Sequence, residues 1–195
     1  MQYAPPRLVA PQPIPPRAHP TAIPPPPDLR QTVSWRFTAS VGGQEIKVAF
    51  GTLRLRSKTE TQCYLTLSEL PDFDLSEQLG AEIIVMALET LEDQAQRSRE
   101  LLRFFLTGVS LTETTHSASA SLTGTRIVEY GNLATVALTT IMTQSSTNTS
   151  QRWRLPFRLD LKPGDTATFA GGTLLITEIA LYLNPSSSYM EITNG

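Results

Sequence analysis

The chain has 195 residues and a formal net charge of −2, so it lacks the basic footprint with which nucleic-acid-binding proteins neutralise phosphates. Cys63 is the only cysteine, which excludes an intrachain disulfide framework. Charged residues make up only 17%, against roughly 25% in typical soluble domains. A surface poor in charge suits β-sheets that are buried against partners in an assembly.

The first residues have neither the charged start nor the apolar core of a signal peptide. No stretch approaches the roughly 18 consecutive apolar residues that a membrane helix needs. We therefore expect a protein that is made and kept in a cytoplasm-like compartment, or released by lysis, and that has no membrane partner.

Residues 1–30 contain eleven of the fifteen prolines. Proline fixes φ and removes a backbone donor, so neither a helix nor a central strand is expected, and polyproline II at roughly 3.1 Å per residue is the default. Composition alone favours a semi-rigid linker. Because a segment without its own core recovers its ordering entropy only on another surface, we expect an extended arm laid across neighbouring subunits. The apolar residues expected to bind those partners are Tyr3, Leu8, Val9, Ile14, Ile23 and Leu29, with Arg7, Arg17 and Arg30 at the rim.

From residue 32 the sequence alternates between apolar and polar residues, which predicts strands. Gly42-Gly43 is a two-residue hairpin signal. On the return strand we expect three residues to point inward: Ile46, Val48 and Phe50. The alternation continues through Leu53 and Leu55, and then through Cys63, Leu65 and Leu67. Cys63 is therefore interpreted as a small core residue rather than a nucleophile.

Residues 68–80 are predicted to form a loop with one helical turn, in which the acidic residues are solvated rather than metal-binding. Residues 81–88 form a nearly continuous apolar strand, as in a sheet covered on both faces. Residues 89–106 fit either a helix or a long hairpin with a charged tip near residues 94–98. We favour the hairpin, because alternation resumes at once from Val109 to Leu122.

Gly124 and Gly131 are expected to bracket a domain boundary. Beyond it, apolar residues alternate from Trp153 to Leu161, and a last hairpin is expected over residues 174–183. Pro163-Gly164-Asp165 predicts a turn. Three arginines lie opposite the apolar face of residues 153–161, where they form either a solvated face or a partner-binding strand face: Arg152, Arg154 and Arg158.

These patterns predict an all-β protein with two small antiparallel β-barrel or sandwich domains after the proline-rich arm. We expect the arm to span residues 1–30, the first β domain 31–125 and the second 126–195.

Motifs for catalysis are sparse. The two histidines, His19 and His116, are interpreted as surface residues. No glycine-rich phosphate loop, Cys/His metal spacing or nucleophile elbow occurs, so we expect no cofactor, no metal and no enzyme activity. A glycosidase carboxylate pair need not be close in sequence, but an aromatic content of 7% is low for a sugar-binding cleft.

A segment rich in Leu and Arg, residues 50–57, is followed by Tyr64-Leu65-Thr66-Leu67. In these segments the chain resembles tail-tip and baseplate proteins of tailed bacteriophages. Further segments in the same order are residues 119–126, 152–154, 163–166 and 189–192. The resemblance spans roughly residues 33–193. It implies a virion component with two barrel-like, hub-type domains in a ring at the tail end, and it brings no catalytic residues.

The leading hypothesis is thus a virion structural protein of a phage tail tip or baseplate. It would assemble into a ring with copies of itself and with neighbouring virion proteins, through its β domains and its arm. One alternative is a capsid cement or decoration protein. Another is a carbohydrate-binding module, which requires Trp35 or Trp153 to face solvent, whereas both lie on the apolar sides of their strands.

Overall fold

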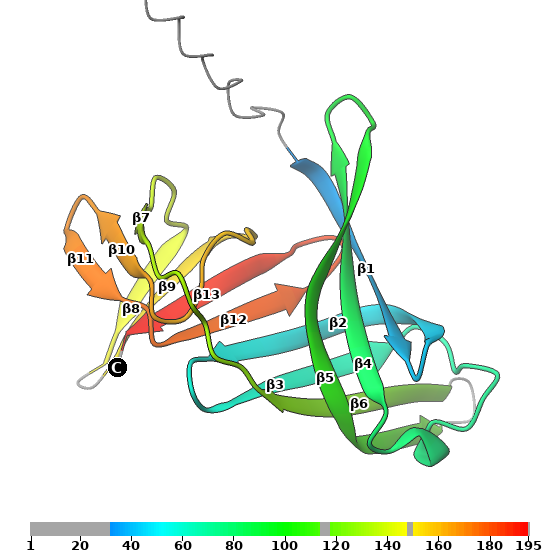
Figure 1. Cartoon of the computed structure of the whole chain (residues 1–195). Coiled ribbons are helices and arrows are strands. Elements are labelled where there is room, and N and C mark those ends of the chain that lie inside the picture. Colours follow the sequence, from blue (N-terminus) through cyan, green and yellow to red (C-terminus); the bar gives the residue numbers. More distant parts are fainter. Residues whose placement is uncertain (1–31, 114–117, 148–149, 195) are drawn as a thin grey trace, which may run out of the picture.

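A computed structural model describes residues 32–113, 118–147 and 150–194 of the chain (Figure 1). This described part consists of thirteen strands and one short 3-10 helix, η1 (Ser76–Gln78). The strands are β1 (Thr32–Val41), β2 (Gln44–Arg56), β3 (Glu60–Leu67), β4 (Glu82–Leu91), β5 (Gln96–Glu113), β6 (Ala118–Ile127), β7 (Thr135–Ala137), β8 (Thr143–Ser146), β9 (Gln151–Pro156), β10 (Thr166–Phe169), β11 (Gly172–Leu175), β12 (Glu178–Leu183) and β13 (Tyr189–Asn194). The predicted all-β class is confirmed.

The first six strands form a closed antiparallel barrel. Its order is β1-β4-β5-β6-β3-β2, and the pairing of β1 with β2 closes it. The strands are long and strongly curved around one another (Figure 1). Where residues 38–41 of β1 pair with residues 44–47 of β2, closure removes the free edges that an open sheet would expose.

Strand β2 connects the barrel to the rest of the molecule. Residues 44–47 pair with β1, whereas residues 51–56 pair with β12 along the same edge. From β12 the sheet continues through β13 and β9 to β8. The predicted domain boundary near residue 125 stays a prediction. The barrel strands precede this boundary, apart from the last residues of β6. However, β12 from beyond the boundary is hydrogen-bonded to β2 of the barrel.

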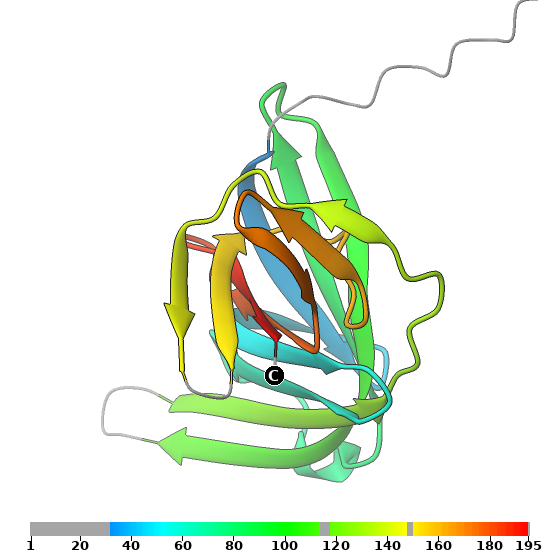
Figure 2. The same cartoon turned by 90° about the vertical axis from the view of Figure 1, so that its left-hand side faces the viewer.

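A second, three-stranded sheet has the order β11-β10-β7, with β7 parallel to β10. It lies on the side that faces the viewer in Figure 2. The ring of Phe169 at the end of β10 packs 5.8 Å from that of Trp153 in β9. The two sheets therefore bury their apolar faces against each other in this half of the molecule.

The hairpin between β1 and β2 is confirmed. Gly42 and Gly43 have φ values of 57° and 86°. A type I′ hairpin turn requires positive φ at both of its central residues. The segment 89–106 is also a hairpin, with β4 ending at Leu91 and β5 beginning at Gln96. Its turn lies a few residues earlier than expected and contains Gln94 at φ 62°. The loop of residues 68–80 contains η1, as predicted.

The prediction that Phe50 points inward is wrong. The register of β2 against β3 shifts between Val48 and Phe50, which is a β-bulge. One extra residue reverses the alternation, so Ile46 and Val48 are buried before the bulge and Leu53 and Leu55 after it. Phe50 is consequently 56% exposed.

One expectation for the second half is corrected. Residues 174–183 are no hairpin, because β11 and β12 belong to different sheets; the hairpins are β10–β11 and β12–β13. Gly124, one of the two glycines expected to bracket the domain boundary, lies inside β6, opposite Cys63. There a Cβ would lie 2.9 Å from Ile83 Cδ1 and 3.0 Å from Phe104 Cβ, so the glycine allows close packing within the barrel.

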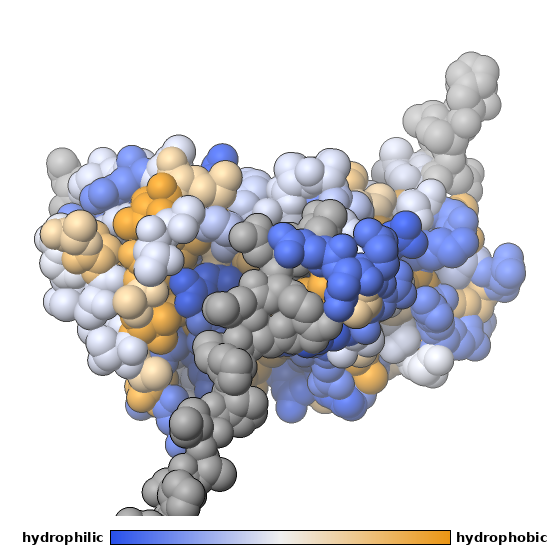
Figure 3. All heavy atoms as spheres, turned by 90° about the horizontal axis from the view of Figure 1, so that it is seen from above, coloured by the Kyte–Doolittle hydropathy of each residue, from blue (hydrophilic) through white to orange (hydrophobic). Residues whose placement is uncertain are grey.

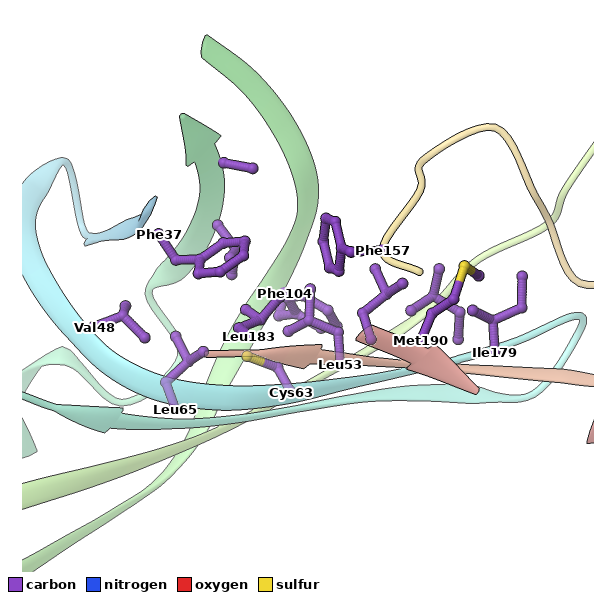
Figure 4. Close-up of a cluster of buried hydrophobic side chains, with 14 of the residues drawn as sticks. Phe37, Val48, Leu53, Cys63, Leu65, Phe104, Phe157, Ile179, Leu183 and Met190 are labelled. Atoms are coloured by element: carbon purple, nitrogen blue, oxygen red, sulfur yellow. The ribbon is translucent and has the colours of Figure 1, made fainter. Parts of the chain in front are cut away.

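One continuous hydrophobic core runs through both halves. Figure 4 shows side chains of the barrel, such as Phe37 and Leu65, in a row with Phe157, Ile179 and Met190 from the second half. Phe157 makes the junction: its ring lies 5.6 Å from that of Phe37. Cys63 is fully buried, as predicted. Among the residues described, no helix is long and apolar enough to cross a membrane.

Candidate interaction surfaces

The six apolar arm residues proposed to bind partners lie outside the described residues, so their role stays a prediction. These residues are Tyr3, Leu8, Val9, Ile14, Ile23 and Leu29. The described part of the chain does place the three arginines, and it separates them into two sites.

Arg152 and Arg154 lie on the outer face of β9, beside Glu191 of β13. The register pairs Arg154 with Glu191. The Arg154 guanidinium donates to Glu191 Oε1 at 3.0 Å, and Arg152 Nη1 lies 3.5 Å from Oε2. Glu191 is only 7% exposed, so the pair of arginines compensates a carboxylate that is largely removed from water.

Two tyrosines extend this site. Tyr182 and Tyr189 stack with ring centroids 4.4 Å apart, and the Arg154 guanidinium carbon lies 4.2 Å from the centre of the Tyr189 ring. The Tyr182 hydroxyl donates to Glu191 at 3.2 Å. Burial, and then the neighbouring Glu191 carboxylate, raise the pKa of Tyr182. We call Arg152, Arg154, Tyr182, Tyr189 and Glu191 the Glu191 cluster. Arginine and tyrosine held rigidly are residue types enriched in protein interfaces.

Arg158 belongs to a different site. It lies beyond the end of β9 and forms a two-pronged ion pair with Asp160, with Nε 2.6 Å from Oδ1. This hydrogen bond holds the pKa of Asp160 below its usual value. Arg158 therefore does not share a strand face with the other two arginines.

Arg158 and Asp160 line a cavity of about 480 Å³, which we call the Trp35 cavity. Its other lining residues are Trp35, Glu89, Arg99, Phe157 and Leu159. Trp35 of β1 lies directly opposite Glu89 of β4, and its ring is 4.9 Å from that of Phe157. The cavity thus lies near the start of β1, beside the hairpin of β4 and β5. Its lining combines two aromatic side chains with charged side chains of both signs.

Apolar side chains are also exposed elsewhere. Phe50 and Tyr64 flank a groove of about 220 Å³ on the outside of the barrel. Seen from above, hydrophobic residues gather over the side that carries β7, β10 and β11, whereas hydrophilic residues gather over the β4–β5 hairpin (Figure 3). Leu133 and Leu175 are more than half exposed. Within the described ranges, no group of three or more His, Cys, Asp or Glu side chains is placed to hold a metal ion.

The sequence did not predict the Glu191 cluster or the Trp35 cavity. Both depend on pairings between distant strands, β13 with β9 and β1 with β4. One signal for the cluster was present: Glu191 lies between the apolar residues Met190 and Ile192, and an acid requires a cationic partner when it is buried.

No family model and no curated protein sequence matches the chain. Solved structures do match its fold. A tail protein from Neisseria meningitidis superposes with a TM-score of 0.55 at 7% identity, covering 82% of this chain and 96% of that one. A tail protein of prophage MuSo2 from Shewanella oneidensis gives 0.56 at 5%, with the same coverage. A component of the Escherichia coli type VI secretion system, described as structurally similar to tail proteins of bacteriophage T4, gives 0.51 at 8%, covering 76% and 73%. The predicted resemblance to tail-tip and baseplate proteins is confirmed at the level of the fold.

Proposed function

We propose that this chain is a structural protein of a phage tail tip or baseplate. It joins copies of itself and neighbouring virion proteins into a ring, through its β domains and its N-terminal arm. The observation that carries this proposal is the fold match over almost the whole described chain, which covers 96% of two phage or bacterial tail proteins.

The surfaces described above suit such a role. The Glu191 cluster presents an arginine and stacked tyrosines whose positions are fixed before any partner binds, which lowers the entropy cost of association. An arm that leaves one subunit and binds the next makes a head-to-tail contact, and head-to-tail contacts close into rings when the rotation permits.

The proposed role is non-catalytic. The one cysteine, a candidate nucleophile by residue type, is buried, and burial raises the pKa of the Cys63 thiol to about 12. A neutral, inaccessible thiol is a poor nucleophile. Of the two tryptophans on which a carbohydrate-binding module would depend, Trp153 is fully buried and Trp35 is half-buried against Phe157, so no fully exposed tryptophan platform supports that function.

The experiment is a phage genome in which codons 2–30 of this gene are deleted. We expect intact, filled heads with absent or malformed tail tips, and the truncated protein missing from purified particles. A second genome keeps every proline but replaces the six apolar arm residues by serine. It should show the same defect, because these residues are the proposed contacts of the arm. Normal tails that contain the truncated protein would contradict the role of the arm. Unstable heads with normal tails would instead favour the capsid cement protein.

A further inference from the structure

We infer that the Trp35 cavity is the receptor for the proline-rich arm of a neighbouring copy, and that residues 13–17 of that arm occupy it. This inference rests on the proposed function, because it names the surface that the arm grips. The segment reads Pro13-Ile14-Pro15-Pro16-Arg17.

The lining of the cavity fits a polyproline II segment. Such segments bind grooves lined by aromatic residues, because the flat proline rings pack on them and little conformational entropy is lost. Trp35 and Phe157 provide two rings at 4.9 Å with an angle of 59° between their planes, and Leu159 adds an aliphatic contact. Trp35 is half-buried, so it is held by the core and still borders the cavity.

The charges of the arm and of the remaining chain are complementary. Residues 1–31 carry three arginines and one aspartate, a net charge of +2, which leaves 13 basic and 17 acidic residues, a net −4, in residues 32–195. Inside the cavity, Glu89 has a side chain only 11% exposed and lies 3.6 Å from Arg99. Arg17 would join Arg99 at this carboxylate, in the way that Arg152 and Arg154 share Glu191. Asp160 adds a second acid at the edge.

The reach of the arm selects residues 13–17. The arm joins β1 at Thr32, and Trp35 of the cavity lies near the same end of β1, so in a ring of equivalent copies each arm starts level with its neighbour's cavity. The distance from the start of one copy's arm to its neighbour's cavity is about the diameter of one small domain, ~30 Å. From Arg17 to Thr32 there are about 15 residues, or ~47 Å in polyproline II. Pro27 is only about five residues from Thr32, or ~16 Å in polyproline II, which is too short to reach the neighbour's cavity.

The same stiffness disfavours binding to the chain's own cavity. Four consecutive prolines, residues 24–27, leave only residues 28–31 in which the chain could reverse its direction before β1. A neighbouring copy's arm needs no reversal. Proline positions nearer to β1 thus act as a spacer that directs the arm outward.

The test is photo-cross-linking of the full-length chain. A benzophenone amino acid replaces Ile14 in copies of natural isotope content, and these are mixed with uniformly ¹⁵N-labelled unmodified copies. After irradiation, mass spectrometry of the digest identifies which peptides are joined and from which copy each comes. We expect cross-links between the light arm and heavy peptides that contain Trp35 or residues 157–160. Placing the benzophenone at the exposed Tyr64 is the control and should give no cross-link to these peptides.

A charge reversal in the arm sharpens the test without altering the folded part. Arg17→Glu should reduce the cross-link yield about tenfold, because a charge-assisted contact becomes a repulsion, whereas the matched Arg7→Glu should leave the yield unchanged. Cross-links only within light copies, cross-links to other heavy peptides, or none at all would each overturn the inference. If the arm deletion still abolishes incorporation in those cases, the proposed function stands and only the receptor is misassigned.

Discussion

At the scale of single residues, Glu191 is the group on which the outer face of the β12–β13–β9 sheet depends. It accepts hydrogen bonds or ion pairs from Arg152, Arg154 and Tyr182 while remaining 7% exposed. Removing one member of such a network leaves the others without compensation, and that cost exceeds the net value of any single contact.

We predict that Glu191→Gln lowers the free energy of unfolding by about 1–3 kcal/mol, because the arginines lose a charged acceptor at an almost dry position. Urea denaturation measures the change. The matched control is Glu77→Gln, at an exposed glutamate in η1, which should change stability by less than about 0.5 kcal/mol. Equal effects of the two substitutions would show that the Glu191 cluster contributes no stability.

Cys63 gives a prediction for pH. Burial raises the pKa of its thiol from 9.0 to about 12. In the unfolded chain the thiol ionises near pH 9, while in the folded chain it stays neutral up to about pH 12. The unfolded state therefore binds fewer protons in this window, and the free energy of unfolding falls as pH rises from about 9 to 12, by up to ~1.4 kcal/mol per pH unit.

In the Cys63→Ala variant the free energy of unfolding should no longer show this contribution to the decrease with pH. The variant should also be less stable at pH 7, because its side chain at this buried position is smaller. Urea denaturation at several pH values between 8 and 11 compares the two slopes. Identical slopes for the two proteins would mean that the thiol is not buried in the folded state.

At the scale of elements, the bulge in β2 decides which side chains enter the core on either side of it. Gly51 follows the bulge and lies against β3: a Cβ there would lie 2.6 Å from Leu65 Cδ2 and 2.8 Å from the Tyr64 carbonyl oxygen. The backbone oxygen cannot move away without disturbing the ladder between β2 and β3.

Gly51→Ala should therefore destabilise the protein by about 1–3 kcal/mol through overpacking. Gly131→Ala is the matched control, because a Cβ at Gly131 meets nothing within 4 Å and the backbone there has no positive φ. Thermal unfolding of the two variants should separate them clearly. A Gly51→Ala variant as stable as the control would contradict the described path of β2 through the bulge.

The strands themselves could be predicted because alternation is a local signal. The hairpins at Gly42-Gly43 and in residues 89–106 followed from it, as did the burial of Cys63 and Trp153. The bulge could not be predicted, because the extra residue carries no distinctive side chain and appears only as a change of parity between Val48 and Leu53. Residues 174–183 were misinterpreted for a related reason: the sequence marks where strands lie but not which sheet each joins.

At the scale of the whole molecule, the barrel and the second half share strand β2 and one core. This arrangement could not be predicted from the sequence, because the pairing of β12 with β2 joins segments that are far apart in the chain. The surface sites share this limit: the Glu191 cluster and the Trp35 cavity each unite residues from strands that are far apart in the chain.

Because the core is continuous, we predict that both halves unfold in one cooperative transition. Tryptophan fluorescence, to which buried Trp153 of the second half contributes, and the reactivity of the Cys63 thiol in the barrel should give the same urea midpoint. Two separated midpoints would show that the halves are independent and that the pairing of β2 with β12 is weak.

The proposed role as a structural protein of a phage tail tip or baseplate is tested most directly by locating the native chain in purified particles. Heads and tails are separated and analysed by quantitative mass spectrometry, with the major capsid and major tail proteins as internal standards. We expect the chain in the tail fraction, in a few copies per particle as the proposed single ring requires. Its recovery in the head fraction, or its absence from both fractions, would contradict the proposed role in the tail.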